Sequence, residues 1–170
     1  MLVDPIFQSP QSLVDRKKRY NYSKILSFLY KNGSTSIADL AKELHSSVPS
    51  ITAMLAELIE NAWVIETGAA KTKSGRRPVF YDLNASKKTI LVVDVNIFET
   101  NFIFINLKNK ILNRTSFKIN IEKSSYLDEV IKEIDGLLGI NKGTWAIGIS
   151  APGLIDTKQG LNFSHENLNQ

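Results

Sequence analysis

The hydrophobic pattern changes its period once, at about Trp63, and this change limits the possible folds more than any other feature of the sequence. Before Trp63, apolar residues recur at helical spacing in three short segments within about 40 residues. After it, runs of β-forming residues alternate with short polar stretches. We therefore expect an α+β protein with two domains. We place their boundary between residues 86 and 87, inside the polar stretch Asn84 to Lys88.

Three helices are expected before the change of period. The first covers about Tyr22 to Lys31 and stops at Asn32-Gly33, a frequent kind of helix end. The second covers residues 37–45, and either Ser34 or Ser36 can cap it. Only a few residues separate the second helix from the third, as in a helix-turn-helix.

The third helix is expected to begin after Ser47 and to run to about Asn61. Ser47 is a suitable N-cap, and Pro49 falls in the first turn, where its missing N–H does no harm. The residues expected on the buried face of this helix are Val48, Ile51, Leu55, Leu58 and Ile59. The outward positions are then Pro49, Ser50, Ala53 and Glu57, with Thr52 at the flank.

A hairpin with a long basic tip is expected after the third helix. Its strands are Trp63–Glu66 and Val79–Leu83, on either side of the segment 67–78, which contains two glycines. Helix–helix–helix–hairpin is the order of a winged helix-turn-helix, whose third helix enters the major groove of DNA. This order predicts a DNA-binding domain over residues 1–86.

Two groups of residues are expected to contact DNA. At the start of the third helix they are Ser47, Pro49, Ser50 and Thr52, where hydroxyls can bond to base edges or phosphates. In the hairpin tip they are Lys71, Lys73, Arg76 and Arg77, which suit phosphates or a narrow minor groove. The alternative for the first group is that these residues only cap their helix and keep it soluble. The alternative for the second group is that its charges only keep the loop soluble.

The charge of the chain is divided unevenly between its two parts. Residues 1–88 hold 13 Lys and Arg against 8 Asp and Glu, whereas residues 89–170 hold 8 against 9. A basic first part favours a polyanionic partner, although ordinary surface charge is the alternative. The run Arg16-Lys17-Lys18-Arg19 precedes the first expected helix and is interpreted as a basic N-terminal arm, either solvated or in contact with phosphate.

The second part is expected to begin with a meander of three strands. These cover residues 90–95, 101–107 and 111–121. An amphipathic helix follows, capped by Ser124 or Ser125, and its apolar residues are Leu127, Val130, Ile131, Ile134, Leu137 and Leu138. A short buried strand, Trp145–Ser150, then leads into the turn Ala151-Pro152-Gly153.

Composition excludes several classes of site. The 170 residues include no cysteine, which excludes disulfides and thiolate chemistry, and two widely separated histidines, which argue against a multi-histidine metal site. No run approaches the roughly 18 apolar residues of a membrane span, and the first ten residues lack the features of a secretory signal. We therefore expect a soluble, cytoplasmic protein.

Two separate stretches resemble one known family. Residues 50–64, followed by Gly75-Arg76-Arg77-Pro78 and Leu83-Asn84, resemble the DNA-binding end of ROK-family (repressor, open reading frame, kinase) transcriptional regulators. Residues 147–156, with Gly160 soon after, resemble a loop that follows a core strand of the ROK sugar-binding domain. The resemblance covers about residues 20–170 and is of the type of the xylose and N-acetylglucosamine repressors.

The resemblance implies more than the residue patterns do by themselves. It implies that residues 87–170 are the first part of a ROK sugar-sensing domain, a partial α/β actin-like (ribonuclease H-like) lobe with a strand meander and a crossover helix, truncated before the family's zinc motif. It implies a repressor of carbohydrate genes, working as a homodimer on a palindromic operator and, in its full-length form, responding to a sugar or sugar phosphate. The residues that it points to for sugar binding are Gly153, Asp156 and Asn167.

Two other functions stay open at this stage. ROK kinases hold ATP phosphates with an Asp-x-Gly-Gly-Thr turn, but the matching stretch here is Asp94-Val95-Asn96-Ile97-Phe98, which lacks both glycines and the threonine. A sugar kinase is therefore the less favoured alternative, and the comparison with the family implies no enzymatic activity and no cofactor for this chain. A protein-interaction module is the other, since winged helices also bind proteins, and its binding should respond little to salt.

Overall fold

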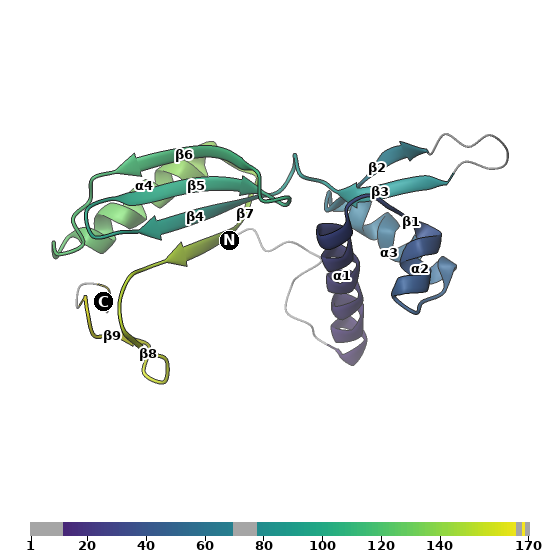
Figure 1. Ribbon diagram of the computed structural model, residues 1–170, viewed down its shortest axis with the longest axis horizontal. Coiled ribbons are helices and arrows are strands. Elements are labelled where there is room, and N and C mark those ends of the chain that lie inside the picture. The colour runs from purple at the N-terminus through teal and green to yellow at the C-terminus, as the bar shows by residue number, and fades with distance from the viewer. Residues whose placement is uncertain (1–11, 70–77, 166–167, 169–170) are drawn as a thin grey trace. The chain divides into compact units, whose positions relative to one another are not determined.

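A computed structural model of the chain describes residues 12–69, 78–165 and 168, and it is drawn in Figure 1. The chain divides into two compact units, residues 1–88 and 89–170. The expected boundary at 86/87 falls just before this division. The expected wing-tip residues Lys71, Lys73, Arg76 and Arg77, and the expected sugar ligand Asn167, lie outside the described residues.

Each helix of the first unit begins at a serine that caps it. The helices are α1 (Leu13–Asn32), α2 (Ile37–Glu43) and α3 (Val48–Glu60), and their N-caps are Ser12, Ser36 and Ser47. In every case the serine oxygen accepts a hydrogen bond from the backbone N–H three residues later, which satisfies one of the free donors of the first turn.

Helix α1 begins at Leu13 rather than at about Tyr22, so the prediction of a basic arm before the first helix is wrong. The run 16–19 lies inside the helix. Ser12 and Asp15 start it, because Ser12 accepts from the Asp15 N–H and donates to the Asp15 carboxylate at 2.8 Å. The first turn buries no apolar side chain, and Leu13 is 80% exposed, so helical periodicity could not signal it.

The buried face of α3 matches the predicted face except at Val48 and at Ile59, which is half-buried. Ile51, Leu55 and Leu58 are buried, as expected, and Met54 joins them. Val48 was expected in the core but is 51% exposed, because it is the first residue of α3 and lies one turn before the packed face begins. Tyr22, Ile25 and Leu29 are the buried residues of α1.

The end of α3 turns sharply through a residue in the left-handed conformation. Ala62 has φ 60, and the N–H of Trp63 donates to the carbonyl of Leu58 at 2.8 Å. The N–H of Ala62 donates to the carbonyl of Ile59 at 2.9 Å, which completes a Schellman motif. Trp63 and Leu58 are both buried beneath this turn.

A small antiparallel sheet completes the first unit. Its strands are β1 (Thr35–Ser36), β2 (Val64–Ala69) and β3 (Val79–Leu83), in the order β1-β3-β2. The two-residue strand β1 was not predicted. The ladder between β2 and β3 carries a bulge between Glu66 and Gly68, where Gly68 has φ 113, a conformation that favours glycine.

The second unit is built on a mixed sheet in the order β6-β5-β4-β7. Strands β4 (Thr89–Val95), β5 (Thr100–Asn106) and β6 (Ile111–Phe117) form the antiparallel meander. Helix α4 (Tyr126–Ile140) then carries the chain back so that β7 (Thr144–Ser150) pairs parallel to β4 (Figure 1). The small hairpin of β8 (Ile155–Asp156) and β9 (Leu161–Asn162) follows.

The core of the second unit lies between one face of this sheet and α4. Its buried residues are Leu91, Val93, Val95, Phe102, Phe104, Ile119, Ile121, Tyr126 and Val130. The hydroxyls of Thr100 and Tyr126 share a buried hydrogen bond of 2.9 Å across it. Ile119 and Ile121, expected in the third strand, instead pack into this core from the connection to α4, because β6 ends at Phe117.

Strand β7 is not buried, contrary to the sequence prediction. Ile147 and Ile149 pair in register with Leu91 and Val93, which places them on the same face of the sheet as the core. They are nevertheless 43% and 68% exposed, because β7 is an edge strand and contributes no residue to the core beneath α4.

Among the described residues, none of the helices combines the length and the apolar character needed to cross a membrane.

Candidate nucleic-acid interface

The turn between α2 and α3 sets the direction of α3. It comprises residues 44–47, and His45 within it has φ 50. The N–H of Ser46 donates to the carbonyl of Ala41 at 2.9 Å, and the N–H of His45 donates to that of Lys42 at 3.3 Å. This is a second Schellman motif, with histidine where glycine is usual. Helix, short turn and helix therefore have the geometry of a helix-turn-helix.

The exposed start of α3 presents the residues that were predicted to read DNA. Ser47, Pro49, Ser50 and Thr52 are all exposed. Their hydroxyls are not equivalent. Ser47 Oγ accepts from the Ser50 N–H at 3.3 Å, and Thr52 Oγ1 donates to the Val48 carbonyl at 2.9 Å, so both serve the helix itself. Ser50 Oγ has no partner among the residues that the structure describes and is free to bond to a ligand.

A polar cluster that sequence reasoning missed joins α1 to the flank of α3. The hydroxyl of Tyr22 donates to Glu57 Oε2, and Lys18 Nζ lies 2.6 Å from the same oxygen. Lys18 Nζ also lies 5.8 Å from the centre of the Tyr22 ring. The spacing of Lys18 and Tyr22 puts them on one face of a helix, but nothing local identifies Glu57 as their partner.

The three groups of this cluster shift one another's pKa. The hydrogen bond from Lys18, and after it the one from Tyr22, lowers the pKa of Glu57. The hydrogen bond to Glu57 raises the pKa of Lys18. Burial, followed by the hydrogen bond to Glu57, raises the pKa of Tyr22 to about 12. At neutral pH the cluster therefore holds an ammonium, a carboxylate and a neutral phenol.

Strands β2 and β3 hold the ends of the predicted wing. Ala69 pairs with Val79, so the strands bring both ends of the segment 70–78 to one place. Contacts between the residues just before β2 and just after β3 close the base of the hairpin: the Asn84 N–H donates to the Trp63 carbonyl at 2.9 Å, and Lys88 Nζ lies 4.9 Å from the centre of the Trp63 ring. The four cations of the predicted wing tip are not among the described residues, so their contact with DNA stays a prediction.

The turn between β4 and β5 contains the stretch that is compared above with the phosphate-holding turn of ROK kinases. The Asn96 N–H donates to the Glu99 carbonyl at 2.9 Å, and Asn96 Nδ2 donates to Asp94 Oδ2 at 3.1 Å. Phe98 is 83% exposed at this turn. The Asp94 carboxylate is thus used to fix the turn, and no glycine opens the backbone to a phosphate.

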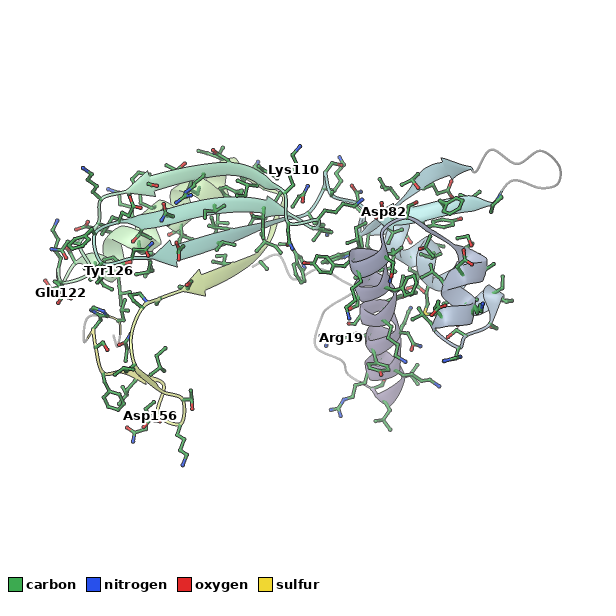
Figure 2. The ribbon with its side chains drawn as sticks, viewed as in Figure 1. Arg19, Asp82, Lys110, Glu122, Tyr126 and Asp156 are labelled. Carbon is green, nitrogen blue, oxygen red and sulfur yellow. The ribbon has the colours of Figure 1, made fainter. Side chains whose placement is uncertain are left out.

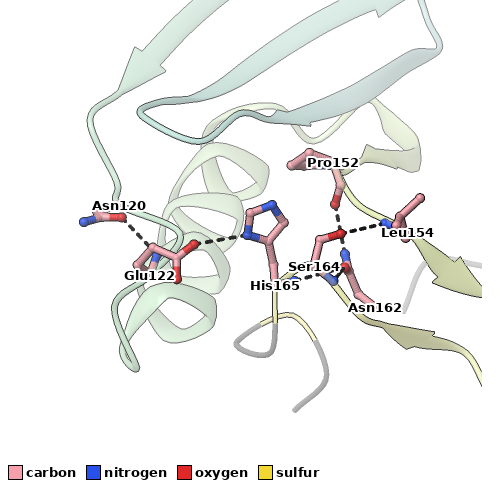
Figure 3. A network of polar contacts seen from close by, with 7 residues as sticks. All are labelled: Asn120, Glu122, Pro152, Leu154, Asn162, Ser164 and His165. Carbon is pink, nitrogen blue, oxygen red and sulfur yellow. Dashed lines mark hydrogen bonds and ion pairs between the residues drawn. The ribbon is translucent and has the colours of Figure 1, made fainter.

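Two of the predicted sugar ligands, Gly153 and Asp156, lie around the β8–β9 hairpin, and Figure 3 shows contacts that hold this region. Asp156 Oδ1 accepts from the N–H groups of Lys158 and Gln159 at 2.8 and 3.2 Å, which is the local turn role. Gly153 has φ 132 and lies against Asn162. Sugar binding by Gly153 and Asp156 stays a prediction.

Asn162 is the buried centre of this region and was not predicted. Its Nδ2 donates to the Pro152 carbonyl at 2.9 Å, and its Oδ1 accepts from the N–H groups of Ser164 and His165 at 3.0 and 3.1 Å. His165 Nδ1 lies 3.1 Å from Glu122 Oε1, which connects the segment after β9 to the segment that precedes α4 (Figure 3). Asn162 is one of several asparagines in this stretch, and no sequence pattern marks it as the buried one.

Comparison with known proteins agrees with the helix-turn-helix geometry. A family described as winged helix-turn-helix DNA-binding matches residues 23–63. The xylose repressor of Caldicellulosiruptor bescii is 26% identical over 157 residues, covering 89% of this chain and 39% of the repressor. The xylose repressor of Bacillus subtilis is 26% identical over 152 residues, covering 86% of this chain and 40% of the repressor. The chain thus spans about two fifths of the length of these relatives.

A solved structure has the same fold. It is the crystal structure of a ROK-family transcriptional regulator described as a homologue of the E. coli MLC protein. It matches with a TM-score of 0.68 at 22% identity, over 89% of this chain and 40% of its own. The expected α+β fold, a winged helix followed by a mixed-sheet lobe, is confirmed. The resemblance to xylose repressors in sequence, and to a ROK-family transcriptional regulator in fold, is confirmed over about two fifths of their length.

Proposed function

We propose that this chain is the DNA-binding end of a sugar-responsive transcriptional repressor of carbohydrate genes, acting in the cytoplasm on double-stranded DNA. The observation that carries the proposal is the exposed start of α3, presented by a helix-turn-helix turn and flanked by the hairpin of β2 and β3. The names of the relatives support the same role, since they are called xylose repressors.

In this proposal α3 lies in the major groove and the wing contacts the backbone beside it. Ser50 is the base-reading hydroxyl, because Ser47 and Thr52 use theirs within the helix. Two copies of the winged helix bind the half-sites of a palindromic operator. A sugar or sugar phosphate changes the geometry of the pair through the sensor, of which residues 89–170 form the first part.

The proposal includes no enzymatic activity and no cofactor for this chain. The β4–β5 turn supports that reading, because Asp94 is engaged by Asn96 and the glycines of a phosphate loop are replaced. ATP turnover with any hexose would contradict it.

The direct test is fluorescence anisotropy with the whole chain. It is titrated against the duplex upstream of its own gene and against a scrambled duplex, each at two salt concentrations that differ fourfold. Binding that prefers the upstream duplex and weakens tenfold or more at the higher salt is expected if about four phosphates are contacted. Binding that ignores sequence, or that salt hardly changes, would overturn the proposal and favour a protein partner.

A further inference from the structure

We infer that the N-terminal half of α1 is a second phosphate-binding element, in which Arg16, Lys17 and Arg19 project around the part of the helix that the contact between Lys18 and Glu57 holds beside the recognition helix. This inference rests on the proposed binding of DNA by α3. It assigns a role to a basic segment that lies outside both the helix-turn-helix pair and the wing.

The first step is the place of Glu57 on α3. Ser50 and Glu57 are seven residues apart, so they lie on one flank of the helix, two turns and about 10 Å from each other. The flank that carries the free hydroxyl of Ser50 therefore continues directly to Glu57.

The second step is the attachment of α1 to that flank. Glu57 Oε2 receives both the Tyr22 hydroxyl and the Lys18 ammonium, the latter at 2.6 Å. Tyr22 is 2% exposed, so its ring anchors this part of α1 in the core while its hydroxyl reaches the surface carboxylate. The turns of α1 around residue 18 are thereby fixed beside the recognition helix.

The third step is the charge that remains available. Lys18 neutralises Glu57, a carboxylate that would otherwise repel phosphate at the edge of the reading face. Arg16, Lys17 and Arg19 form no ion pair with any residue that the structure describes. Arg16 and Lys17 are exposed, and Arg19, labelled in Figure 2, is partly exposed on the same part of α1.

The last step is the geometry of the groove. An α-helix with its side chains is about 10–12 Å wide, close to the roughly 12 Å width of the major groove. An element packed against the flank of a helix in that groove consequently faces the phosphate wall. Long basic side chains on such an element are suited to phosphates and carry no information about sequence.

The test is a charge count. The double variant Arg16→Gln/Lys17→Gln is compared with the wild-type chain on the upstream and scrambled duplexes across a salt series. Loss of two phosphate contacts should make the slope of log K against log salt shallower by about 2, with equal loss of affinity on both duplexes. Both side chains are exposed, so the fold should be retained, and circular dichroism verifies this.

The matched control is Lys31→Gln/Lys132→Gln, which removes the same charge at two exposed positions, one in the last turn of α1 and one on α4 of the second unit. Its slope should equal that of the wild-type chain. If the double variant of Arg16 and Lys17 has the same slope as the wild type or as the control, the inference is overturned. The proposed function still stands in that case, provided that the wild-type chain binds the upstream duplex selectively. A wild-type chain without salt-sensitive binding would overturn both.

Discussion

The hydroxyl of Tyr22 on α1 donates a hydrogen bond to Oε2 of Glu57 on α3, across 35 positions of sequence. Because the same oxygen also receives Lys18, one carboxylate holds two side chains of α1 against α3. The orientation of the recognition helix thus depends on a contact outside the helix-turn-helix pair.

Replacing Tyr22 with phenylalanine should reduce the free energy of unfolding by about 1 kcal/mol. The ring and its burial are kept, and only a hydrogen bond to a charged group is lost, while Glu57 retains Lys18 as its partner. Urea denaturation measures the change. Tyr20→Phe is the control, since Tyr20 is 60% exposed and its loss of a hydroxyl should be nearly neutral. Equal effects of the two variants would contradict the role given to the Tyr22 hydroxyl.

The same cluster predicts how stability depends on pH. The pKa of Glu57 is lowered by folding, so its contribution is present above its ordinary value of 4.5 and is lost as pH falls through the lower folded pKa. Folding raises the pKa of Lys18, and it raises the pKa of Tyr22 to about 12. The stability that these two groups contribute is therefore lost only at alkaline pH, as pH rises through their folded pKa.

The measurement is urea denaturation of the wild type and of Glu57→Gln between about pH 3 and pH 7. The wild type should lose more stability than the variant on the acid side, because only the wild type must protonate this carboxylate. Glutamine keeps the shape of the side chain, which makes the comparison a test of charge. If the two plots of stability against pH ran parallel, Glu57 would not contribute to the loss of stability at acid pH.

Ala62→Gly should stabilise the first unit by about 0.5–1 kcal/mol, because Ala62 has φ 60 at the end of α3, where glycine is unstrained. Ala56→Gly is the matched control with the opposite expectation. Ala56 lies exposed in the interior of α3, where glycine costs about 1 kcal/mol. Thermal unfolding distinguishes the two, and destabilisation by both would contradict the Schellman assignment.

Ser50→Ala should reduce the preference for the operator over scrambled DNA more than it reduces binding to scrambled DNA. Thr52→Ala should change this preference little, because the Thr52 hydroxyl already donates to the Val48 carbonyl. Arg76→Ala/Arg77→Ala, in the predicted wing tip, should weaken binding to both duplexes alike and flatten the salt dependence. Anisotropy on the two duplexes measures all three. A larger loss of selectivity from Thr52→Ala than from Ser50→Ala would reverse the assignment.

The parts of the fold that local chemistry decides were predictable. The start of α3 follows from a serine cap with a proline in the first turn, and the meander of β4, β5 and β6 follows from short polar turns between apolar runs. The start of α1 was missed, because its first turn is held by Ser12 and Asp15 and buries no apolar residue.

Features that depend on distant partners could not be predicted. The two residues of β1 are a strand only because Thr35 and Ser36 pair with Tyr81 and Phe80. Strand β7 has an apolar sequence typical of a central strand, and its exposure reflects its place at the sheet edge. The site shows the same division, since the cap of α3 is a local property while its contact with α1 is a tertiary one.

Gly153→Ala should loosen the β8–β9 hairpin, because a Cβ at this position would lie 2.3 Å from Asn162 Oδ1. The amide of Asn162 would have to move, and it is this amide that binds the Pro152 carbonyl and the N–H groups of Ser164 and His165. Those two N–H groups should then exchange with deuterium faster.

Gly160→Ala separates the steric effect from backbone strain. Gly160 also has a positive φ, of 70, but an added Cβ there would meet nothing within 4 Å. Faster exchange at residues 164 and 165 is therefore expected from the variant at Gly153 and not from the one at Gly160. If the two variants raised exchange there equally, strain at glycine alone would explain the effect, and the close contact with Asn162 would not be what holds the hairpin.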